Sequence, residues 1–401
     1  RHEDGGLGHK PFQGTLSGVF SLTRDNPSPH PSSIAILTPM HLLTDIAIGI
    51  LTAYLAFTNM IADGITNVLS PDTSPDEVTQ QTKTDPRAPT GLGRLSSAYQ
   101  TIPQILIDNT AYQSANLQNT QTSKPSSTPI EALVNIYCTY KTQEYIKATT
   151  GTGYFIDTDG IILTNAHVAQ FLLLEGVEGS TECIVRTGNP AEPTYEADLL
   201  YISPAWVQKH ANLITQERPQ GTGERDYALL YVISGLDNKP MPRHFPSLSF
   251  DTELMTTGTL HDEVAAAGYP AEKLFNESDG NAELIPKLAS TSIAELMTFS
   301  SNYADIFTIA GSEVGEQGSS GGPVVNQAGD AIGLISTRGD DEEFGTGSLR
   351  AITLSYIDRT IKEETGFTLE QNLGGNLPFR SQLFKDTLVP FLRGMLEREL
   401  A

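Results

Sequence analysis

The sequence predicts a closed antiparallel β architecture, and three observations support this fold class. The 401 residues include 35 glycines and 24 prolines, which interrupt the chain too often for an all-helical protein. Between residues 130 and 365, short apolar runs of strand length alternate with Gly-rich turns. Helical segments do not alternate with these runs, so a parallel α/β sheet is not expected. An all-β protein built on closed barrels is the interpretation that fits all three.

The strand-like runs follow one another at short intervals. In chain order they read LVNIYC, GYFID, GIILTN, ECIVRTG, YALLYV, EVAAAGY, DIFTIAG, PVVN and AIGLIST. Beyond them the pattern changes, because apolar residues recur every three or four positions in 357–364 and again in 384–400, as in amphipathic helices. We therefore assign 130–365 to the folded domain and 366–401 to a helical C-terminal tail.

The part of the chain before residue 130 has a different composition. Residues 1–41 are rich in Gly, Pro, Ser and His and are predicted to be flexible, and 63–129 has the polar composition of a linker. Residues 42–62 are predicted to form a hydrophobic helix, in which 42–61 has about the 20 residues that a membrane span needs. A membrane anchor and an interfacial or soluble amphipathic helix both remain open, because polar and small residues share one face of this helix. These residues are Asp45, Gly49, Thr52, Ala56, Asn59 and Asp63.

The charge excludes one large class of partner. With 48 acidic and 25 basic residues, the net charge of −23 would repel a nucleic acid, and no basic patch offsets it. Two cysteines exclude a four-cysteine zinc site, and HExxH, P-loop and dinucleotide motifs are absent from the sequence. The sequence therefore predicts no metal and no organic cofactor.

The most informative segment is GEQGSSGGP, from Gly315 to Pro323. A nucleophilic serine needs a tight backbone that presents its hydroxyl and aims amide N–H groups at the oxygen that becomes negative. We identify Ser320 as the candidate nucleophile and the N–H groups of Gly318 and Ser320 as the candidate oxyanion hole. The alternative is an ordinary Gly-Ser turn between strands.

Two further segments supply a base and an acid. A hairpin with an Asp159-Gly160 turn leads through an apolar strand to TNAHV, where His167 stands at the strand end. Asp226 directly precedes the strand YALLYV and is a candidate to orient the imidazole of His167. The alternative for His167 alone is a structural histidine whose hydrogen bonds are satisfied. The alternative for Asp226 alone is an ordinary turn aspartate. Together, the order His167, Asp226 and Ser320 predicts a catalytic triad.

The motifs TNAHV, DYALL and GSSGGP together resemble the trypsin-like or chymotrypsin-like serine proteases, and in particular their HtrA-like branch. The resemblance covers residues 130–365 and implies two six-stranded antiparallel β-barrels with the active site between them. It also implies that the backbone of Ser336, Thr337 and Arg338 pairs with the substrate as an added strand. The 36 residues after Thr365 are too few for the PDZ domain that many HtrA-like proteins carry.

The two cysteines, Cys138 and Cys183, lie in strands that would be neighbours in a barrel of this family. A disulfide between them is therefore expected, with two buried free thiols as the alternative. A disulfide would indicate an oxidising, extracytoplasmic compartment such as the cell envelope, the periplasm or the outside of the cell.

We predict a serine endopeptidase that acts on polypeptides outside the cytoplasm, anchored by residues 42–61 if these span a membrane. The main alternative is a catalytically silent protease fold that binds peptides or partner proteins. A third interpretation is a structural envelope protein whose N-terminal half carries the function. The oligomeric state is not predictable from these features.

Overall fold

The structure is a computed structural model. It describes residues 93–94, 105–116, 127–141, 146–176, 181–216, 221–272, 283–299 and 301–400. The predicted flexible segment 1–41, the hydrophobic helix 42–62 and most of the predicted linker 63–129 lie outside these residues. Within the described ranges, no helix has the length and apolar character that a membrane span requires.

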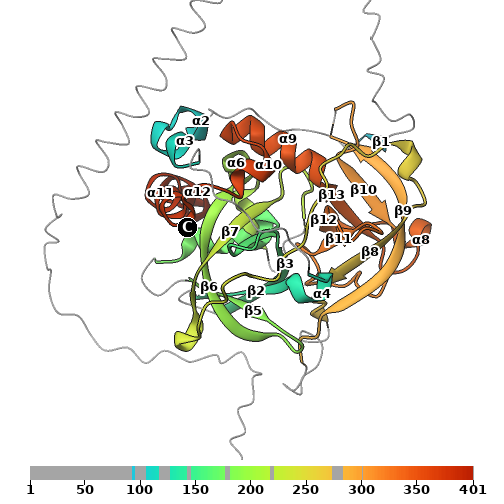
Figure 1. Cartoon of the computed structure of the whole chain (residues 1–401), viewed down its shortest axis with the longest axis horizontal. Helices are drawn as coiled ribbons and strands as arrows, with labels where there is room; N and C mark the ends of the chain where they lie inside the picture. The colour runs from blue at the N-terminus through green and yellow to red at the C-terminus, as the bar shows by residue number, and fades with distance from the viewer. Residues whose placement is uncertain are drawn as a thin grey trace, which may run out of the picture. The chain divides into compact units, whose positions relative to one another are not determined.

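The first barrel is a closed sheet of six antiparallel strands in the order β2-β3-β4-β7-β6-β5 (Figure 1). Its strands are β2 (Leu133–Lys141), β3 (Ile146–Phe155), β4 (Ile161–Thr164), β5 (Thr181–Thr187), β6 (Glu192–Ile202) and β7 (Ala228–Gly235). The predicted hairpin is present, since Gly160 adopts a φ of 93° in the turn that joins β3 to β4. β4 is buried along its whole length, as expected from its apolar sequence.

The second barrel contains the strands β9-β10-β13-β12-β11-β8, and a pairing of β8 with β9 closes it. Its strands are β8 (Glu263–Gly268), β9 (Lys287–Thr298), β10 (Ile306–Ile309), β11 (Pro323–Val325), β12 (Ala331–Arg338) and β13 (Leu349–Thr353). A short strand β1 (Gly93–Arg94) adds in parallel to β9. The predicted pair of six-stranded antiparallel barrels is confirmed.

Helices flank the barrels (Figure 1). They are α2 (Ile105–Asp108), α3 (Thr110–Asn116), α4 (Pro129–Ala132), α5 (Ala166–Ala169), α6 (Pro204–His210), α8 (Asp341–Phe344), α9 (Leu354–Thr365), α10 (Leu369–Asn372), α11 (Leu377–Thr387) and α12 (Val389–Leu400). The 3-10 helices are η1 (Gln170–Leu174), η2 (Ala211–Thr215), η3 (Leu236–Asn238) and η4 (Thr257–Thr259).

The C-terminal helices pack on the first barrel. α11 lies against β6, and α12 contacts η1, η2 and α6. The Arg393 side chain fixes α12 to η1, because its Nε donates to the carbonyl of Leu173 at 2.7 Å and its Nη2 to the carbonyl of Glu175 at 2.7 Å. The predicted tail is therefore helical and forms part of the same hydrophobic core as the first barrel.

Helices α2 and α3 lie within the segment predicted as a linker, yet they are packed against the C-terminal helices. Tyr112 of α3 is fully buried, and its hydroxyl donates to Oδ1 of Asn372 at 3.2 Å. The buried guanidinium of Arg380 in turn donates to the Tyr112 hydroxyl at 3.2 Å and to the carbonyls of Asn372 and Gly374 at 2.8 and 2.6 Å. These polar contacts hold residues 105–116 on the domain.

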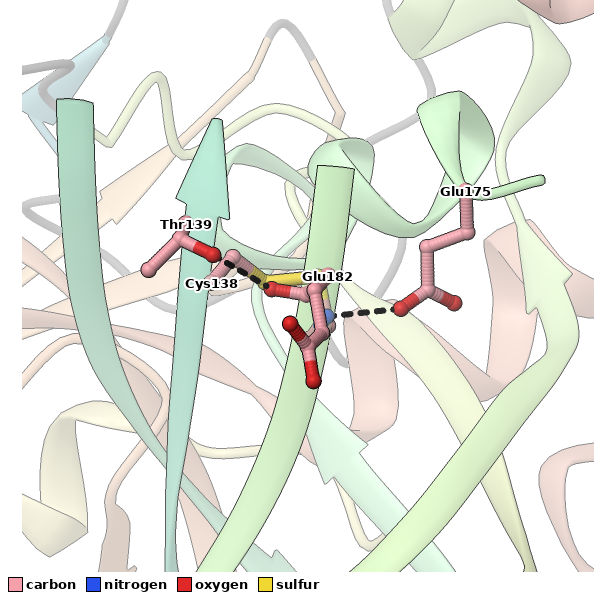
Figure 2. Close-up of a disulfide and its surroundings, with 5 residues drawn as sticks. Cys138, Thr139, Glu175 and Glu182 are labelled. Atoms are coloured by element: carbon pink, nitrogen blue, oxygen red, sulfur yellow. Dashed lines mark hydrogen bonds between the residues drawn. A yellow bond between two sulfur atoms is a disulfide. The ribbon is translucent and has the colours of Figure 1, made fainter. Parts of the chain in front are cut away.

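A disulfide joins Cys138 of β2 to Cys183 of β5, which stand directly opposite each other in the barrel (Figure 2). The expected pairing is therefore present. Beside it, a carboxylate oxygen of Glu175 accepts the backbone N–H of Cys183 at 2.7 Å (Figure 2). Burial raises the pKa of Glu175 to about 7, although this hydrogen bond acts in the opposite direction.

Candidate active site

His167 stands where strand β4 ends and helix α5 begins, at the position that the sequence predicts. The short helix places its imidazole in the interior, where the side chain is almost fully buried. Nδ1 of His167 lies 2.8 Å from Oδ2 of Asp226, and the backbone N–H of His167 donates to Oδ1 of the same carboxylate at 2.9 Å. A carboxylate on Nδ1 leaves Nε2 as the ring nitrogen that is free to exchange a proton.

Asp226 is fully buried directly before β7, and its carboxylate is surrounded by donors. Besides His167, it accepts the N–H of Thr222 at 3.1 Å and the hydroxyl of Ser336 at 3.0 Å. Burial by itself would raise the pKa of Asp226, but the charge of His167 and the hydrogen bonds from His167 and from the Thr222 N–H outweigh it and lower the pKa. The carboxylate is therefore held ionised, as required to stabilise an imidazolium.

The backbone before Asp226 is held by contacts to α9. Arg225 adopts a φ of 54°, a conformation that non-glycine residues rarely take. Its guanidinium is fixed by ion pairs with Glu364 at 2.7 Å and Glu363 at 2.6 Å, both on α9. The Asp226 carbonyl accepts the side-chain amide of Asn165 at 2.8 Å, which ties this loop to the start of α5. The loop that presents the acid is thus fixed from two sides.

Ser320 lies in the loop that precedes β11 of the second barrel. Its hydroxyl donates to the carbonyl of Ser336 at 3.3 Å, and Ser336 in turn donates to Asp226. Ser336 therefore links the serine to the acid of the first barrel. A hydroxyl has one proton to donate, so the proton of Ser320 is directed at Ser336 here, and donation to His167 requires that this long hydrogen bond is broken.

The Gly318 N–H and the Ser320 N–H were predicted as the oxyanion hole, and the loop geometry is compatible with this role. Gly318 adopts a φ of 100°, and a Cβ on it would lie 2.7 Å from the carbonyl oxygen of Tyr269. The carbonyl of Gln317 accepts the N–H of Ala271 at 2.7 Å. Since C=O and N–H point in opposite directions in a trans peptide, the N–H of Gly318 is directed away from Ala271.

The predicted substrate-binding residues lie at the end of β12. The pairing of β12 with β13 shifts between Ile335 and Thr337, so Ser336 occupies a β-bulge and its carbonyl is turned out of the ladder. Ser336, Thr337 and Arg338 line a pocket of about 210 Å³ that also contains Ser320. The remaining lining residues are Gly221, Glu272, Glu316, Gln317, Gly318 and Leu349. Gly318, Ser320 and the three β12 residues thus border one pocket, Asp226 hydrogen-bonds to Ser336 of its lining, and His167 is connected to the pocket through Asp226.

Several contributors were not identified from the sequence. Asn165 and Thr222 fix Asp226 and its backbone, and Thr152 contacts the Ser320 loop from the first barrel. The only signal for Thr152 is its position in the GTG motif before the hairpin. Among the described residues, no cluster of three or more His, Cys, Asp or Glu side chains is arranged to hold a metal ion.

Comparison with known proteins identifies the domain. Residues 151–334 match the sequence model of the trypsin-like peptidase domain. No curated protein matches the chain. Among solved structures, the active form of the Rv3671c protease from M. tuberculosis is 20% identical, with a TM-score of 0.36, and the match covers 74% of this chain and 96% of that one. Deg5 is 16% identical, with a TM-score of 0.38 and coverage of 59% and 90%. The match to the sequence model shows that residues 151–334 form a trypsin-like peptidase domain, as the motifs predict, and the enzyme class is serine peptidase.

Proposed function

We propose that the protein is a serine endopeptidase in which Ser320, His167 and Asp226 form the catalytic triad. The observation that carries this proposal is the hydrogen-bonded chain from Asp226 to His167 and, through Ser336, to Ser320.

The proposed reaction proceeds in two halves. The Ser320 Oγ attacks the scissile carbonyl carbon while Nε2 of His167 takes its proton, and the carbonyl electron pair moves to the oxygen. The N–H groups of Gly318 and Ser320 stabilise that oxyanion. As the C–N bond breaks, His167 returns the proton to the leaving amine. Water then attacks the acyl-enzyme by the same route and releases the acid and Ser320.

The substrate in this proposal is a polypeptide that adds as a strand along Ser336 to Arg338. Bulged residues leave backbone groups unpaired in the ladder, and an extended peptide can use them. Among the residues that line the pocket, acidic side chains (Glu272 and Glu316) and Arg338 are both present. The fold and the pocket thus support endoproteolysis without fixing the preferred residue before the scissile bond.

The decisive experiment is mass spectrometry of the purified chain after incubation with a fluorophosphonate. We expect one adduct on Ser320 in the wild type and none in Ser320→Ala. Ser319→Ala is the matched control, because it removes a buried hydroxyl from the neighbouring residue and should leave labelling intact. A folded wild-type protein without an adduct would overturn the proposal in favour of the silent scaffold.

We also propose that the protein acts outside the cytoplasm. The disulfide between Cys138 and Cys183 supports this location, since disulfides persist in oxidising compartments. Alkylation of intact cells before lysis, followed by mass spectrometry, tests it. Unmodified, bridged cysteines are expected, whereas alkylation of both thiols would argue for a reducing compartment.

A further inference from the structure

Thr152 lies in the middle of β3, and it is fully buried where the first barrel faces the loop that carries Ser320. Its own ladder partner is Asn135 of β2. Its other hydrogen bonds run outside this pairing, and most of them cross to the second barrel. The residue is therefore a contact between the barrels at the active site.

The Thr152 hydroxyl has both of its hydrogen-bonding functions occupied. Oγ1 donates to the carbonyl of Gly318 at 2.7 Å and accepts the backbone N–H of Tyr269 at 2.9 Å. The backbone N–H of Thr152 donates to the carbonyl of Ser320 at 2.8 Å. The carbonyl of Thr152 is itself fixed by the hydroxyl of Thr164 at 2.7 Å.

Together with bonds from Ala271 and Gly322, the hydrogen bonds of Thr152 give each carbonyl oxygen of residues 317–320 a donor. Gln317 O accepts from Ala271 N, Gly318 O from the Thr152 hydroxyl, Ser319 O from Gly322 N, and Ser320 O from Thr152 N. One residue of the first barrel thus holds two of these four carbonyls. The Ser319 N–H is also engaged, with the carbonyl of Glu316 at 3.3 Å. The N–H groups of Gly318 and Ser320 remain for the substrate.

Gly318 needs such an external restraint. A glycine passes between positive and negative φ at little steric cost, so its own side chain cannot fix the orientation of its N–H. Ala271 holds the peptide before Gly318, and the Thr152 hydroxyl holds the peptide after it. With both flanking peptides fixed, the dihedral angles of Gly318 are determined, and so is the direction of its N–H.

We propose that Thr152 is a positioning residue for the oxyanion hole: its hydroxyl holds the Gly318–Ser319 peptide while Ala271 holds the peptide that carries the N–H of Gly318, and the two contacts together keep the N–H groups of Gly318 and Ser320 directed at the reacting carbonyl. The inference rests on the proposed serine peptidase function and deepens it. It assigns the preorganisation of a second-barrel loop to a side chain of the first barrel. Electrostatic stabilisation of an oxyanion depends on donors that are already in place when the charge develops.

The test uses the full chain with Thr152→Val, which keeps the shape of the side chain and removes the hydroxyl, and Thr152→Ser, which keeps the hydroxyl. Thr308→Val is the matched control, because Thr308 is also a fully buried strand threonine but lies in β10 and contacts Glu295 at 3.4 Å. Fluorophosphonate labelling is followed over a range of probe concentrations. This separates the maximal labelling rate from the concentration that gives half of it.

For Thr152→Val we expect the maximal labelling rate to fall about 10- to 100-fold, approaching the loss seen on removal of an oxyanion donor. The half-saturating concentration should change little, Thr152→Ser should restore the rate to within about 3-fold, and Thr308→Val should label like the wild type. A folded Thr152→Val that labels as fast as Thr308→Val would overturn the inference. If Thr152→Val does not fold, Thr152→Ala takes its place.

A second measurement does not depend on activity. Hydrogen–deuterium exchange is followed in the peptide that contains residues 315–322. Exchange should be faster in Thr152→Val than in the wild type, Thr152→Ser or Thr308→Val, and equal exchange in all four would contradict the inference. A wild type that does not label refutes the proposed function, whereas this comparison still decides whether Thr152 orders the loop.

Discussion

The two barrels have the same strand count and differ in how they are supported. The core of the first barrel continues into the C-terminal helices, and a disulfide joins β2 to β5. Some buried residues of the second barrel, such as Leu334 and Ile352, belong to this same cluster, and the others form a smaller cluster of their own. The first barrel carries His167 and Asp226 and the second carries Ser320. The proposed base and acid are thus built into the first barrel, which the disulfide and the C-terminal helices support, whereas the proposed nucleophile lies on a loop that is held by contacts from the first barrel.

The largest effect expected from this comparison follows from Asp226→Asn. An amide cannot accept from all the donors around this position, and it favours the wrong tautomer of His167. The labelling rate should fall about 10⁴-fold while the fold is retained. The rate of labelling with a fluorophosphonate is the measurement. Asp157→Asn, at a buried carboxylate in the hairpin turn of the same barrel, is the control and should label at nearly the wild-type rate.

Removing the disulfide tests directly how much it stabilises the first barrel. Cys138→Ala together with Cys183→Ala should lower the free energy of unfolding by about 2–4 kcal/mol. Labelling of Ser320 at low temperature should be unchanged, because the bridge does not touch the site. Thermal melts with and without reductant provide the control, since reductant should shift the wild type and leave the double variant as it is. Loss of labelling in the folded variant would contradict this expectation and show that the disulfide helps to position the candidate catalytic residues.

Arg380→Met tests the docking of α3 on the C-terminal helices. The variant leaves the carbonyls of Asn372 and Gly374 and the Tyr112 hydroxyl without their donor. We expect a loss of about 2 kcal/mol in urea unfolding, because buried acceptors without partners are costly. Arg398→Met, at an exposed site on α12, should have little effect. Equal urea-unfolding midpoints for the two variants would argue against a stabilising role of Arg380 in the docking of α3.

The smallest expected effect depends on pH. The pKa of Glu175 is raised to about 7 in the folded protein, so the unfolded chain loses this proton at lower pH than the folded one. Folding is therefore penalised increasingly as pH rises from about 4.5 to 7, and the penalty is complete above pH 7. Glu175→Gln should be about 1–2 kcal/mol more stable than the wild type at pH 8, with the difference vanishing near pH 4. Glu182→Gln, at an exposed carboxylate on β5, is the control variant, and an equal gain at pH 8 in both variants would contradict this prediction.

Much of the barrel architecture could be predicted from the sequence because most strands are apolar runs between turns. The strands β6, β9 and β13 were missed. β9 reads KLASTSIAELMT, and its polar residues hide a strand that is fixed by its pairing with β8 and β10. β6 begins with exposed polar residues, and in β13 (LRAIT) Arg350 interrupts the apolar run. In each case the ladder, and not the apolar pattern, determines the strand.

The predicted helices are present with different limits, and the structure also contains helices that the sequence did not predict. The helix expected over 384–400 is two helices, α11 and α12, and α11 begins earlier, at Leu377 with Pro378 in its first turn. α3 was not predicted, because the contacts that hold it join Tyr112 to residues far along the chain. The candidate triad was accessible to sequence reasoning since each residue has a local motif. Thr152 was not, because its role depends on a contact between barrels.

The extension of the first core into the C-terminal helices has a consequence for synthesis of the protein. Buried residues of α11 and α12, such as Phe384, Leu392 and Leu396, belong to the same cluster as those of β2, β4 and β7. Residues 377–400 are synthesised after all the barrel strands, yet they supply part of the core of the barrel that holds His167 and Asp226. We therefore expect the first barrel to reach its full stability only after residues 377–400 have been synthesised.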